Sequence, residues 1–399
     1  MEIKKHILLI NTLYSPHISG GAEIILKIQA ESLKERGYDV TILATGPEKG
    51  LNVEVINDIK VYRAGLKNLY FHYPRRKKNK FIRMGWHLRD IYNCGMKKYV
   101  REVINSEHPN LVICHNLTGW SASVLDEIYA ADIPSVLVLH DPYFVCANSS
   151  MFKNGKACDN QCTSCKMLRY KHRDVSNRVT ALVGVSSYIV NRVSKLGYFE
   201  NASKHIIHNA RAIHDIGPNN KSSQGQALKF GYLGTLSSTK GVDWLIKQFQ
   251  SVNIDATLDI AGDGAEDYVD HLHKITNSDK IKFLGYTNSE DFFKSIDVLV
   301  VPSIWPDTFP GVAYEACAYH VPVIASNMGG LPEIIKEKVN GLLCDPLDRN
   351  SLGRCIVEVS EDANLYNSLS ANARESVKQL LDPDRWFNEF DSLVQSLVK

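Results

Sequence analysis

The stretch "VPSIWPDTFPGVAYEACAYHVPVIAS", residues 301–326, decides the fold class. The apolar run "DVLVVPS" leads into it, and "VPVIAS" closes it. Both runs are short and rich in β-branched residues, so both are predicted strands, and "GVAYEACAYH" between them has helical character. A strand, a helix and a second strand in this order predict a parallel sheet, in which ligands bind beyond the carboxyl ends of the strands.

Two carboxylates, Asp307 and Glu315, lie eight positions apart at this edge. A helix beginning near Gly311 would direct its first backbone amides, including that of Ala313, towards an anion. Glu315 would suit the paired hydroxyls of a ribose, and Asp307 would accept hydrogen bonds from sugar hydroxyls. Taken singly, either acid is more often a solvated residue or a partner of the helix dipole. Together they predict a site for a sugar diphosphate.

The same alternation of apolar runs and amphipathic segments continues along almost all 399 residues. It restarts after the polar stretch "GPNNKSSQGQA", residues 217–227. The chain is also too long for one ordinary hydrophobic core. We therefore predict an α/β protein with two Rossmann-like domains, over residues 1–210 and 229–378, joined by a linker over 211–228. A C-terminal helix over 379–399 is predicted to pack back on the first domain.

Composition excludes several classes of protein. Hydrophobic residues make up 44% and charged residues 23%, which is a globular composition, and a net charge of +2 gives no reason to expect a nucleic-acid partner. The apolar run near the N-terminus, "HILLI", is shorter than the core of a signal peptide. No apolar stretch approaches the length of a bilayer span. We expect a cytoplasmic protein.

The segment "PSIWPDTFPGVAYEACAYHVPVIASNMGGLPEII" resembles the signature of the family-4 retaining glycosyltransferases of GT-B fold. "SGGAE" at 19–23, "HD" at 140–141, "FGYLGTLSSTKGVDWLI" at 230–246 and "IAGDG" at 260–264 fit the same family. The resemblance covers nearly the whole chain. It implies two facing Rossmann-like domains with the active site in the cleft between them.

The resemblance also implies roles for residues around the acidic pair. Glu315 would bind the ribose, Asp307 would contact the donor sugar, and the backbone at Phe309, Gly311 and Val312 would hold sugar and phosphate. Asp307 stands where the family usually has Glu. Pro310 stands where Gly is common, which removes one amide donor.

Further residues are predicted to hold the diphosphate. Lys240 follows a predicted strand and is suited to a phosphate contact. Thr235 stands where relatives often carry Arg, so Lys240 and backbone amides would carry more of the developing charge. Gly20 and Gly21 lead into a helix whose amides could face the same group. A single loop lysine or a Gly-Gly turn more often has no such role.

His140 ends the predicted strand "VLVLH". A histidine in this position is more often structural, but the resemblance places the matching residue beside the reacting sugar. Asp141 could fix its tautomer, and His115 is a second candidate. The resemblance implies transfer with retention, through front-face attack assisted by the departing phosphate, with no divalent metal at the diphosphate and no cofactor for catalysis.

Four of the nine cysteines lie within 20 residues, in the Cys-rich loop 146–165. They are Cys146, Cys158, Cys162 and Cys165. Four thiolates ending in a C-x2-C pair suit a structural Zn²⁺ with no open position. Free thiols, one disulfide or an iron–sulfur cluster are the alternatives at this point.

The segment "YPRRKKNKFIRMGWHLRD", residues 73–90, concentrates basic and apolar side chains. It could rest on an anionic membrane surface and meet a lipid-linked acceptor, or be an ordinary solvated loop. The resemblance implies a hexosyltransferase that moves sugar from a nucleotide-sugar donor. By analogy we expect a glycan or lipid-linked acceptor in surface-polysaccharide synthesis, with the enzyme peripheral on the inner face of the membrane. A GT-B nucleotide-sugar epimerase and a catalytically inactive nucleotide-sugar binder are the alternatives.

Overall fold

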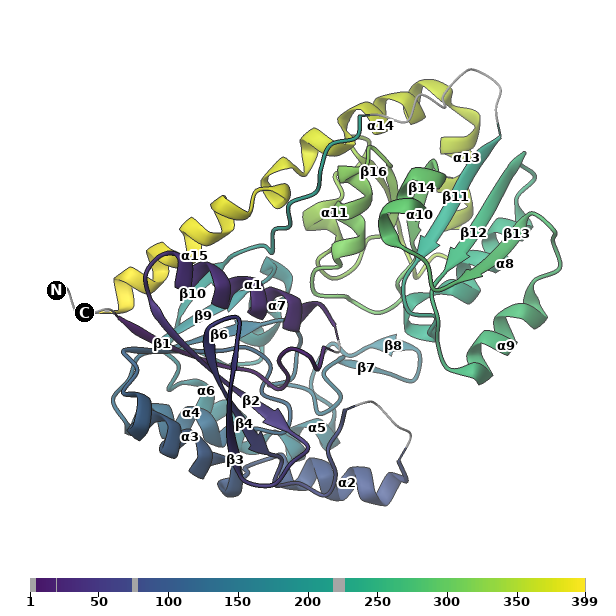
Figure 1. Cartoon of the computed structure of the whole chain (residues 1–399). Coiled ribbons are helices and arrows are strands. Elements are labelled where there is room, and N and C mark those ends of the chain that lie inside the picture. Colours follow the sequence, from purple (N-terminus) through teal and green to yellow (C-terminus); the bar gives the residue numbers. More distant parts are fainter. Residues whose placement is uncertain (1–4, 19, 74–77, 218–226, 399) are drawn as a thin grey trace. The chain divides into compact units, whose positions relative to one another are not determined.

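The structure is a computed structural model that describes residues 5–18, 20–73, 78–217 and 227–398 (Figure 1). It divides into two compact units. The first unit contains the described residues up to Met151, Cys158–Asn209 and those from Asp384 onward. The second unit contains Ala210–Pro383 and the short hairpin Phe152–Ala157.

The first unit is built on an eight-stranded sheet with the order β10-β9-β6-β5-β1-β2-β4-β3. Its strands are β1 (His6–Ile10), β2 (Asp39–Gly46), β3 (Leu51–Ile56), β4 (Ile59–Gly65), β5 (Leu111–Cys114), β6 (Ser135–Leu139), β9 (Ala181–Gly184) and β10 (Ser203–Ile206). Every neighbouring pair is parallel except β3 with β4. Strands β5, β6 and β9 are buried along their whole length, which is why they read as continuous apolar runs.

Helices cover both faces of this sheet, with α3 and α4 on one side and α1 on the other (Figure 1). The helices of the first unit are α1 (Gly21–Glu35), α2 (Lys80–Arg89), α3 (Cys94–Glu107), α4 (Ser123–Ala130), α5 (Thr163–Leu168), α6 (Tyr170–Ser176) and α7 (Ser187–Lys195). The hairpin consists of β7 (Phe152–Lys153) and β8 (Lys156–Ala157).

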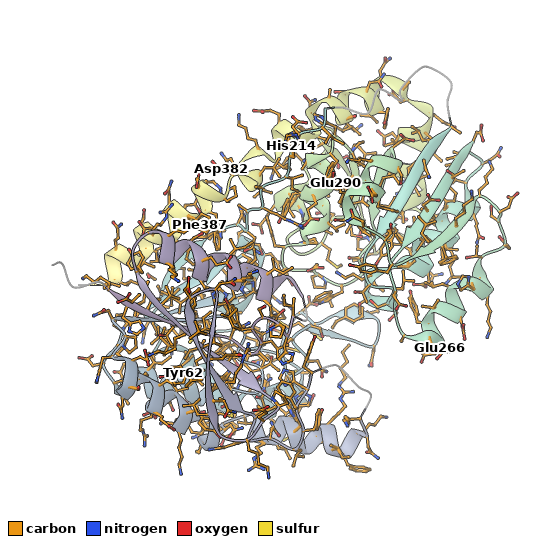
Figure 2. The ribbon with its side chains drawn as sticks, viewed as in Figure 1. Tyr62, His214, Glu266, Glu290, Asp382 and Phe387 are labelled. Atoms are coloured by element: carbon orange, nitrogen blue, oxygen red, sulfur yellow. The ribbon has the colours of Figure 1, made fainter. Side chains whose placement is uncertain are left out.

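The last helix, α15 (Pro383–Leu397), contacts the first unit through its apolar face. Trp386, Phe390, Leu393 and Val394 are buried. The Tyr38 hydroxyl donates to Asp391 at 2.8 Å, and the Arg36 guanidinium lies 5.8 Å from the ring centroid of Phe387, which Figure 2 labels on this helix. The helical spacing of apolar residues at the end of the sequence therefore belongs to a helix that packs on a part of the chain far away in sequence.

The second unit has a six-stranded, fully parallel sheet with the order β13-β12-β11-β14-β15-β16. Its strands are β11 (Leu228–Leu233), β12 (Ala256–Ala261), β13 (Ile281–Gly285), β14 (Val298–Val301), β15 (Val323–Ser326) and β16 (Gly341–Cys344). Its helices are η1 (Ser238–Lys240), α8 (Val242–Ser251), α9 (Glu266–Ile275), α10 (Ser289–Ser295), α11 (Gly311–Ala318), α12 (Leu331–Ile334), α13 (Ser351–Glu361), α14 (Ala363–Ser376) and η2 (Lys378–Leu381).

The start of the predicted linker belongs to the second unit. The Arg211 amide donates to the Leu380 carbonyl at 3.0 Å, and Arg374 donates to the Ile213 carbonyl at 2.8 Å. Residues 218–226 of that linker lie outside the described residues, and β11 begins at Leu228. Within the described ranges, no helix is both long and apolar enough to cross a bilayer.

Candidate active site

The loop between β14 and α11 in the second unit carries Asp307, and a Gly-Gly turn holds its backbone. The Gly330 amide donates to the Asp307 carbonyl at 2.8 Å. A Cβ on Gly330 would lie 2.0 Å from the Thr308 carbonyl oxygen, and one on Gly329 would lie 2.1 Å from that of Asp307. Gly329 also has a φ of +63°. Glycine is needed at both positions because two backbone segments meet there.

The predicted phosphate residue Lys240 lies beside Asp307. Its ammonium forms an ion pair with the Asp307 carboxylate and lies 5.3 Å from the ring centroid of Trp305. The adjacent Gly241 has a φ of +72°, and a Cβ there would lie 1.9 Å from the Pro302 carbonyl oxygen. The Lys240 loop is therefore packed directly on the end of β14, which fixes the position of the ammonium.

The second acid, Glu315, also has a cationic partner. Nη1 of Arg211 donates to Glu315 Oε1 at 3.1 Å. The Glu315 side chain is 17% exposed and that of Arg211 is 53% exposed. The sequence prediction missed Arg211 because it treated this residue as linker. No local pattern marks it, since 104 positions separate it from Glu315.

The N-terminus of α11 differs in part from expectation. The Ala313 amide donates to the Pro310 carbonyl at 3.2 Å, so that amide is already used within the chain. The Phe309 side chain is buried, with its ring centroid 6.1 Å from that of Tyr314. Any contact of Phe309 with a ligand would therefore involve its backbone. Gly311 and Val312 are half-buried at the first turn.

Thr235 lies in the loop after β11 with its side chain exposed. Its carbonyl accepts a hydrogen bond from the Tyr232 hydroxyl at 2.9 Å. A threonine brings no positive charge to this loop. The cations that the described residues place beside the two acids are Lys240 and Arg211.

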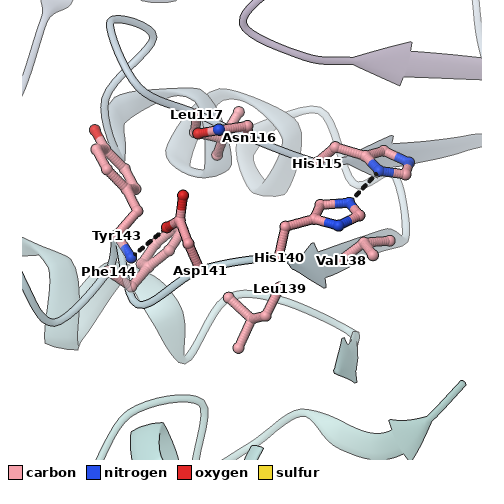
Figure 3. Close-up of a pocket in the computed structure, with 9 residues that line it drawn as sticks. All are labelled: His115, Asn116, Leu117, Val138, Leu139, His140, Asp141, Tyr143 and Phe144. Carbon is pink, nitrogen blue, oxygen red and sulfur yellow. Dashed lines mark hydrogen bonds between the residues drawn. The ribbon is translucent and has the colours of Figure 1, made fainter. Parts of the chain in front are cut away.

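His140 follows β6 in the first unit, and its ring stacks on His115 (Figure 3). Nε2 of His140 lies 2.9 Å from Nδ1 of His115, and Nε2 of His115 lies 2.6 Å from Gln29 Oε1. With Gln29 Oε1 as acceptor, His115 is protonated on Nε2, so its Nδ1 accepts from His140 Nε2–H. His115 and Gln29 therefore set the tautomer of His140.

The two histidines are neutral near pH 7. Burial lowers the pKa of His140 to about 4. Burial, with a smaller contribution from His140, holds the pKa of His115 well below its usual range. The pair can form hydrogen bonds, but it carries no positive charge towards a phosphate.

Asp141 does not have the role that its position beside His140 suggested. Its Oδ1 accepts a hydrogen bond from the Tyr143 amide at 2.7 Å, and the carboxylate points towards that amide in Figure 3. Burial raises the pKa of Asp141 to about 6. The carboxylate therefore shapes the turn after β6, and the tautomer of His140 depends on His115 instead.

Gly20 and Gly21 line a pocket of about 250 Å³ within the first unit, together with His140 and Asp141. The Gly20 amide, however, donates to Glu23 Oε2 at 2.8 Å. Glu23 is 5% exposed, so the chain supplies its own carboxylate to the first turn of α1. An additional anion at this helix terminus would be opposed by that negative charge.

The turn after β6 rests on a buried polar network that the sequence did not reveal. Arg169 Nε donates to the Tyr143 carbonyl at 2.9 Å, and the Tyr143 hydroxyl donates to Asp90 Oδ2 at 2.8 Å. Asp90 and Arg169 are fully buried. The network connects the end of α2, the turn and the start of α6, and so positions the segment that follows His140.

The predicted metal ligands are partly brought together. Cys146 Sγ and Cys165 Sγ lie 3.8 Å apart, and the Cys162 thiol interacts with that of Cys165. Cys158 lies at the end of the hairpin, where its amide donates to the Met151 carbonyl at 2.7 Å. Among the residues that the structure describes, no group of three or more Cys, His, Asp or Glu side chains is placed so that it could hold a metal ion.

Comparisons with known proteins agree with this architecture. Residues 19–211 match the family model "Glycosyltransferase Family 4", and residues 218–376 match "Glycosyl transferases group 1". An uncharacterized 42.6 kDa protein in the cps region of Klebsiella pneumoniae is 27% identical over 332 residues, covering 82% of this chain and 87% of its own length.

Two further proteins align over almost the full length. The N-acetyl-alpha-D-glucosaminyl L-malate synthase of Bacillus anthracis is 21% identical and covers 95% of each chain. The structure of Anabaena HepE in complex with UDP superposes with a TM-score of 0.73 at 19% identity, covering 98% of this chain and 100% of that one. Two Rossmann-like units with parallel sheets, each matched by a transferase family model, identify this chain as a family-4 glycosyltransferase of GT-B fold.

Proposed function

We propose that the enzyme transfers a hexosyl group from a nucleoside-diphosphate sugar, with retention of anomeric configuration. The observation that carries this proposal is the pair of acid–cation contacts around α11, Lys240 with Asp307 and Arg211 with Glu315. Two carboxylates can accept hydrogen bonds from sugar and ribose hydroxyls, while two cations match the charge of a diphosphate. The UDP bound to Anabaena HepE supports a nucleotide donor.

In the proposed reaction, the bond between the anomeric carbon and the diphosphate oxygen breaks. The acceptor oxygen bonds to the same face of that carbon, and its proton moves to the departing phosphate oxygen. Lys240 and Arg211 stabilise the charge that develops on the diphosphate, so we propose that no divalent metal is required there. His140 is assigned a hydrogen bond to the transferred sugar, because its neutral ring is not suited to act as an acid.

We propose a glycan or lipid-linked acceptor at an anionic membrane surface, in the synthesis of a surface polysaccharide. Helix α2 presents Phe81, Met84 and Leu88 to solvent, with Phe81 86% exposed, beside the exposed bases Lys80 and Arg83. Apolar and basic side chains together favour binding to an anionic bilayer. The Klebsiella relative in a cps region is consistent with this class of product. Residues 74–77 of the predicted basic segment lie outside the described residues.

The donor site is tested by thermal unfolding with UDP, GDP, ADP, TDP and CMP, each with and without EDTA. A ligand at 100 times its Kd stabilises a protein by about 2.7 kcal/mol. We expect one nucleoside diphosphate to raise the unfolding temperature with and without EDTA, and Glu315→Ala to abolish the rise. Glu290→Ala, which removes an exposed carboxylate of the same unit, should preserve it. No rise with any nucleotide would contradict the site.

The reaction is then tested with the matching nucleotide sugar and membrane extracts as acceptor source. Formation of an α-linked product from an α-linked donor, read from the anomeric proton coupling, would support retention. Conversion of the donor sugar to its epimer without acceptor would identify an epimerase. Nucleotide binding with no turnover would identify an inactive binder.

A further inference from the structure

We propose that Cys146, Cys158, Cys162 and Cys165 bind one structural Zn²⁺ that closes the loop following His140. The proposal rests on the spacing of the preformed pair, on the backbone around Cys146, and on the places of the other two thiols. It concerns a site that the transfer reaction does not use.

The distance between Cys146 Sγ and Cys165 Sγ fits shared metal ligation. A tetrahedral zinc site with Zn–S bonds of about 2.3 Å places neighbouring sulfurs about 3.8 Å apart. The observed distance is 3.8 Å. A disulfide would require about 2.0 Å. Both residues are buried, at 5% and 9% exposure, so this pair is held in place by the surrounding chain.

Backbone amides around Cys146 are directed at its sulfur. The Met151 amide donates to Cys146 Sγ at 3.3 Å, and the amides of Asn148 and Ser150 also interact with this sulfur. Amide donors that surround a ligating sulfur orient it and offset its negative charge. Ser149 and Met151 adopt positive φ values of 54° and 46°. The turn accepts unusual backbone conformations while directing its amides at one sulfur.

The remaining two cysteines flank this pair on both sides of the loop. Cys162 is the residue before α5, three positions from Cys165, and its thiol interacts with that of Cys165. Cys158 follows β8, and its amide donates to the Met151 carbonyl, next to the amide that binds Cys146. Both are half-buried. The proposed site requires both thiols to move to the preformed pair, because no three such ligands meet among the described residues.

Zinc ligation would have a structural consequence for the first unit. Four protein ligands leave no open coordination position, so the ion would be structural. It would connect the turn six residues after His140 to the start of α5, close to Arg169, which binds the Tyr143 carbonyl. We infer that the ion fixes the segment on which the position of His140 depends.

The test is the metal content of the full-length protein, expressed with added zinc and purified without chelator. We expect about one zinc per chain by elemental analysis. Cys158→Ser and Cys162→Ser should each bind zinc substoichiometrically, whereas Cys94→Ser, which changes an exposed cysteine outside the cluster, should keep the full amount. Replacing zinc with Co²⁺ should give the intense visible bands of a tetrahedral site and the charge-transfer band of thiolate ligands.

Each other result would overturn the proposal. Wild-type protein without zinc and with nine titratable thiols would show free cysteines, and the loss of two thiols would show a disulfide. Iron with acid-labile sulfide would show a cluster. Equal zinc in Cys158→Ser and wild type would show adventitious binding. If the variants do not fold, release of zinc from wild type by a mercurial, measured with a colorimetric chelator, decides the question. Nucleotide binding at Glu315 is measured separately, so the two proposals can fail independently.

Discussion

The Lys240 ammonium and the Asp307 carboxylate form an ion pair across 67 positions of the chain. Their side chains are 27% and 14% exposed, so the pair is partly shielded from water. It joins the loop after β11 to the loop after β14, two neighbouring strands of the second unit. A donor that binds both residues must replace this ion pair with contacts from its own charges and hydroxyls.

Removal of Lys240 should lower activity more than stability. We expect Lys240→Met to reduce kcat/KM by about 10²- to 10³-fold, because one charge that stabilises the leaving diphosphate is lost. Initial rates with the matching nucleotide sugar measure this. Lys294→Met, which removes an exposed lysine paired with Glu290, should have little effect. Because Lys240 and Asp307 interact, the double variant Lys240→Met with Asp307→Asn should lose less than the sum of the two single losses.

Arg211 should contribute to nucleotide binding. We expect Arg211→Ala to raise the Kd of the nucleoside diphosphate about tenfold or more, since a charge-assisted contact contributes about 1.5–3 kcal/mol. Arg211→Lys should restore part of the affinity. Titration calorimetry measures both. The control is Arg354→Ala, which removes an arginine from an exposed pair with Asp348 in the same unit. An unchanged Kd in Arg211→Ala would remove this residue from the donor site.

The Gly-Gly turn should be needed for activity because of close packing. Gly330 has an ordinary φ of −87°, so Gly330→Ala tests the contact with the Thr308 carbonyl alone. We expect a loss of about 1–3 kcal/mol in stability, with reduced kcat as the Asp307 loop shifts. The control is Gly285→Ala, where φ is +68° and no atom lies within 4 Å of an added Cβ. It should cost about 1–2 kcal/mol and leave kcat unchanged. Thermal unfolding and initial rates separate the two effects.

Acid should destabilise the enzyme through the histidine pair, in which His115 is buried and His140 half-buried. The folded-state pKa of His140 is about 4, whereas an unfolded histidine titrates near ~6.5. Between these values only the unfolded chain takes up the proton, so the free energy of unfolding falls as pH falls. The contribution of His140 to the free energy of unfolding is complete above about pH 6.5. About 3 kcal/mol of this contribution is lost by about pH 4.

We therefore expect His140→Gln to reduce the dependence of the unfolding temperature on pH between 6.5 and 4. His271→Gln, which changes an exposed histidine, should leave the dependence as in wild type. Identical pH profiles for His140→Gln and wild type would show that the His115–His140 pair does not remain neutral in the folded protein.

The local pattern of apolar and polar residues was sufficient to predict much of the architecture. Continuous apolar strands such as β5 and β6, and helical spacing in α15, depend on residues that are neighbours in the chain, and burial imposes that periodicity directly. The family resemblance likewise rests on short segments, which is why Asp307, Glu315 and Lys240 could be named from the sequence. In the structure, Asp307 and Lys240 are in contact.

Tertiary structure decided which partner each polar group has. Arg211 contacts Glu315, and His115 sets the tautomer of His140. These two contacts join residues 104 and 25 positions apart. A hydrogen bond or ion pair depends on distance and direction in space. The sequence by itself determined the order of strands and helices and the residue types available at their ends. Only packing of those elements determined which charges meet, because desolvation and Coulomb energy depend on position in the folded protein.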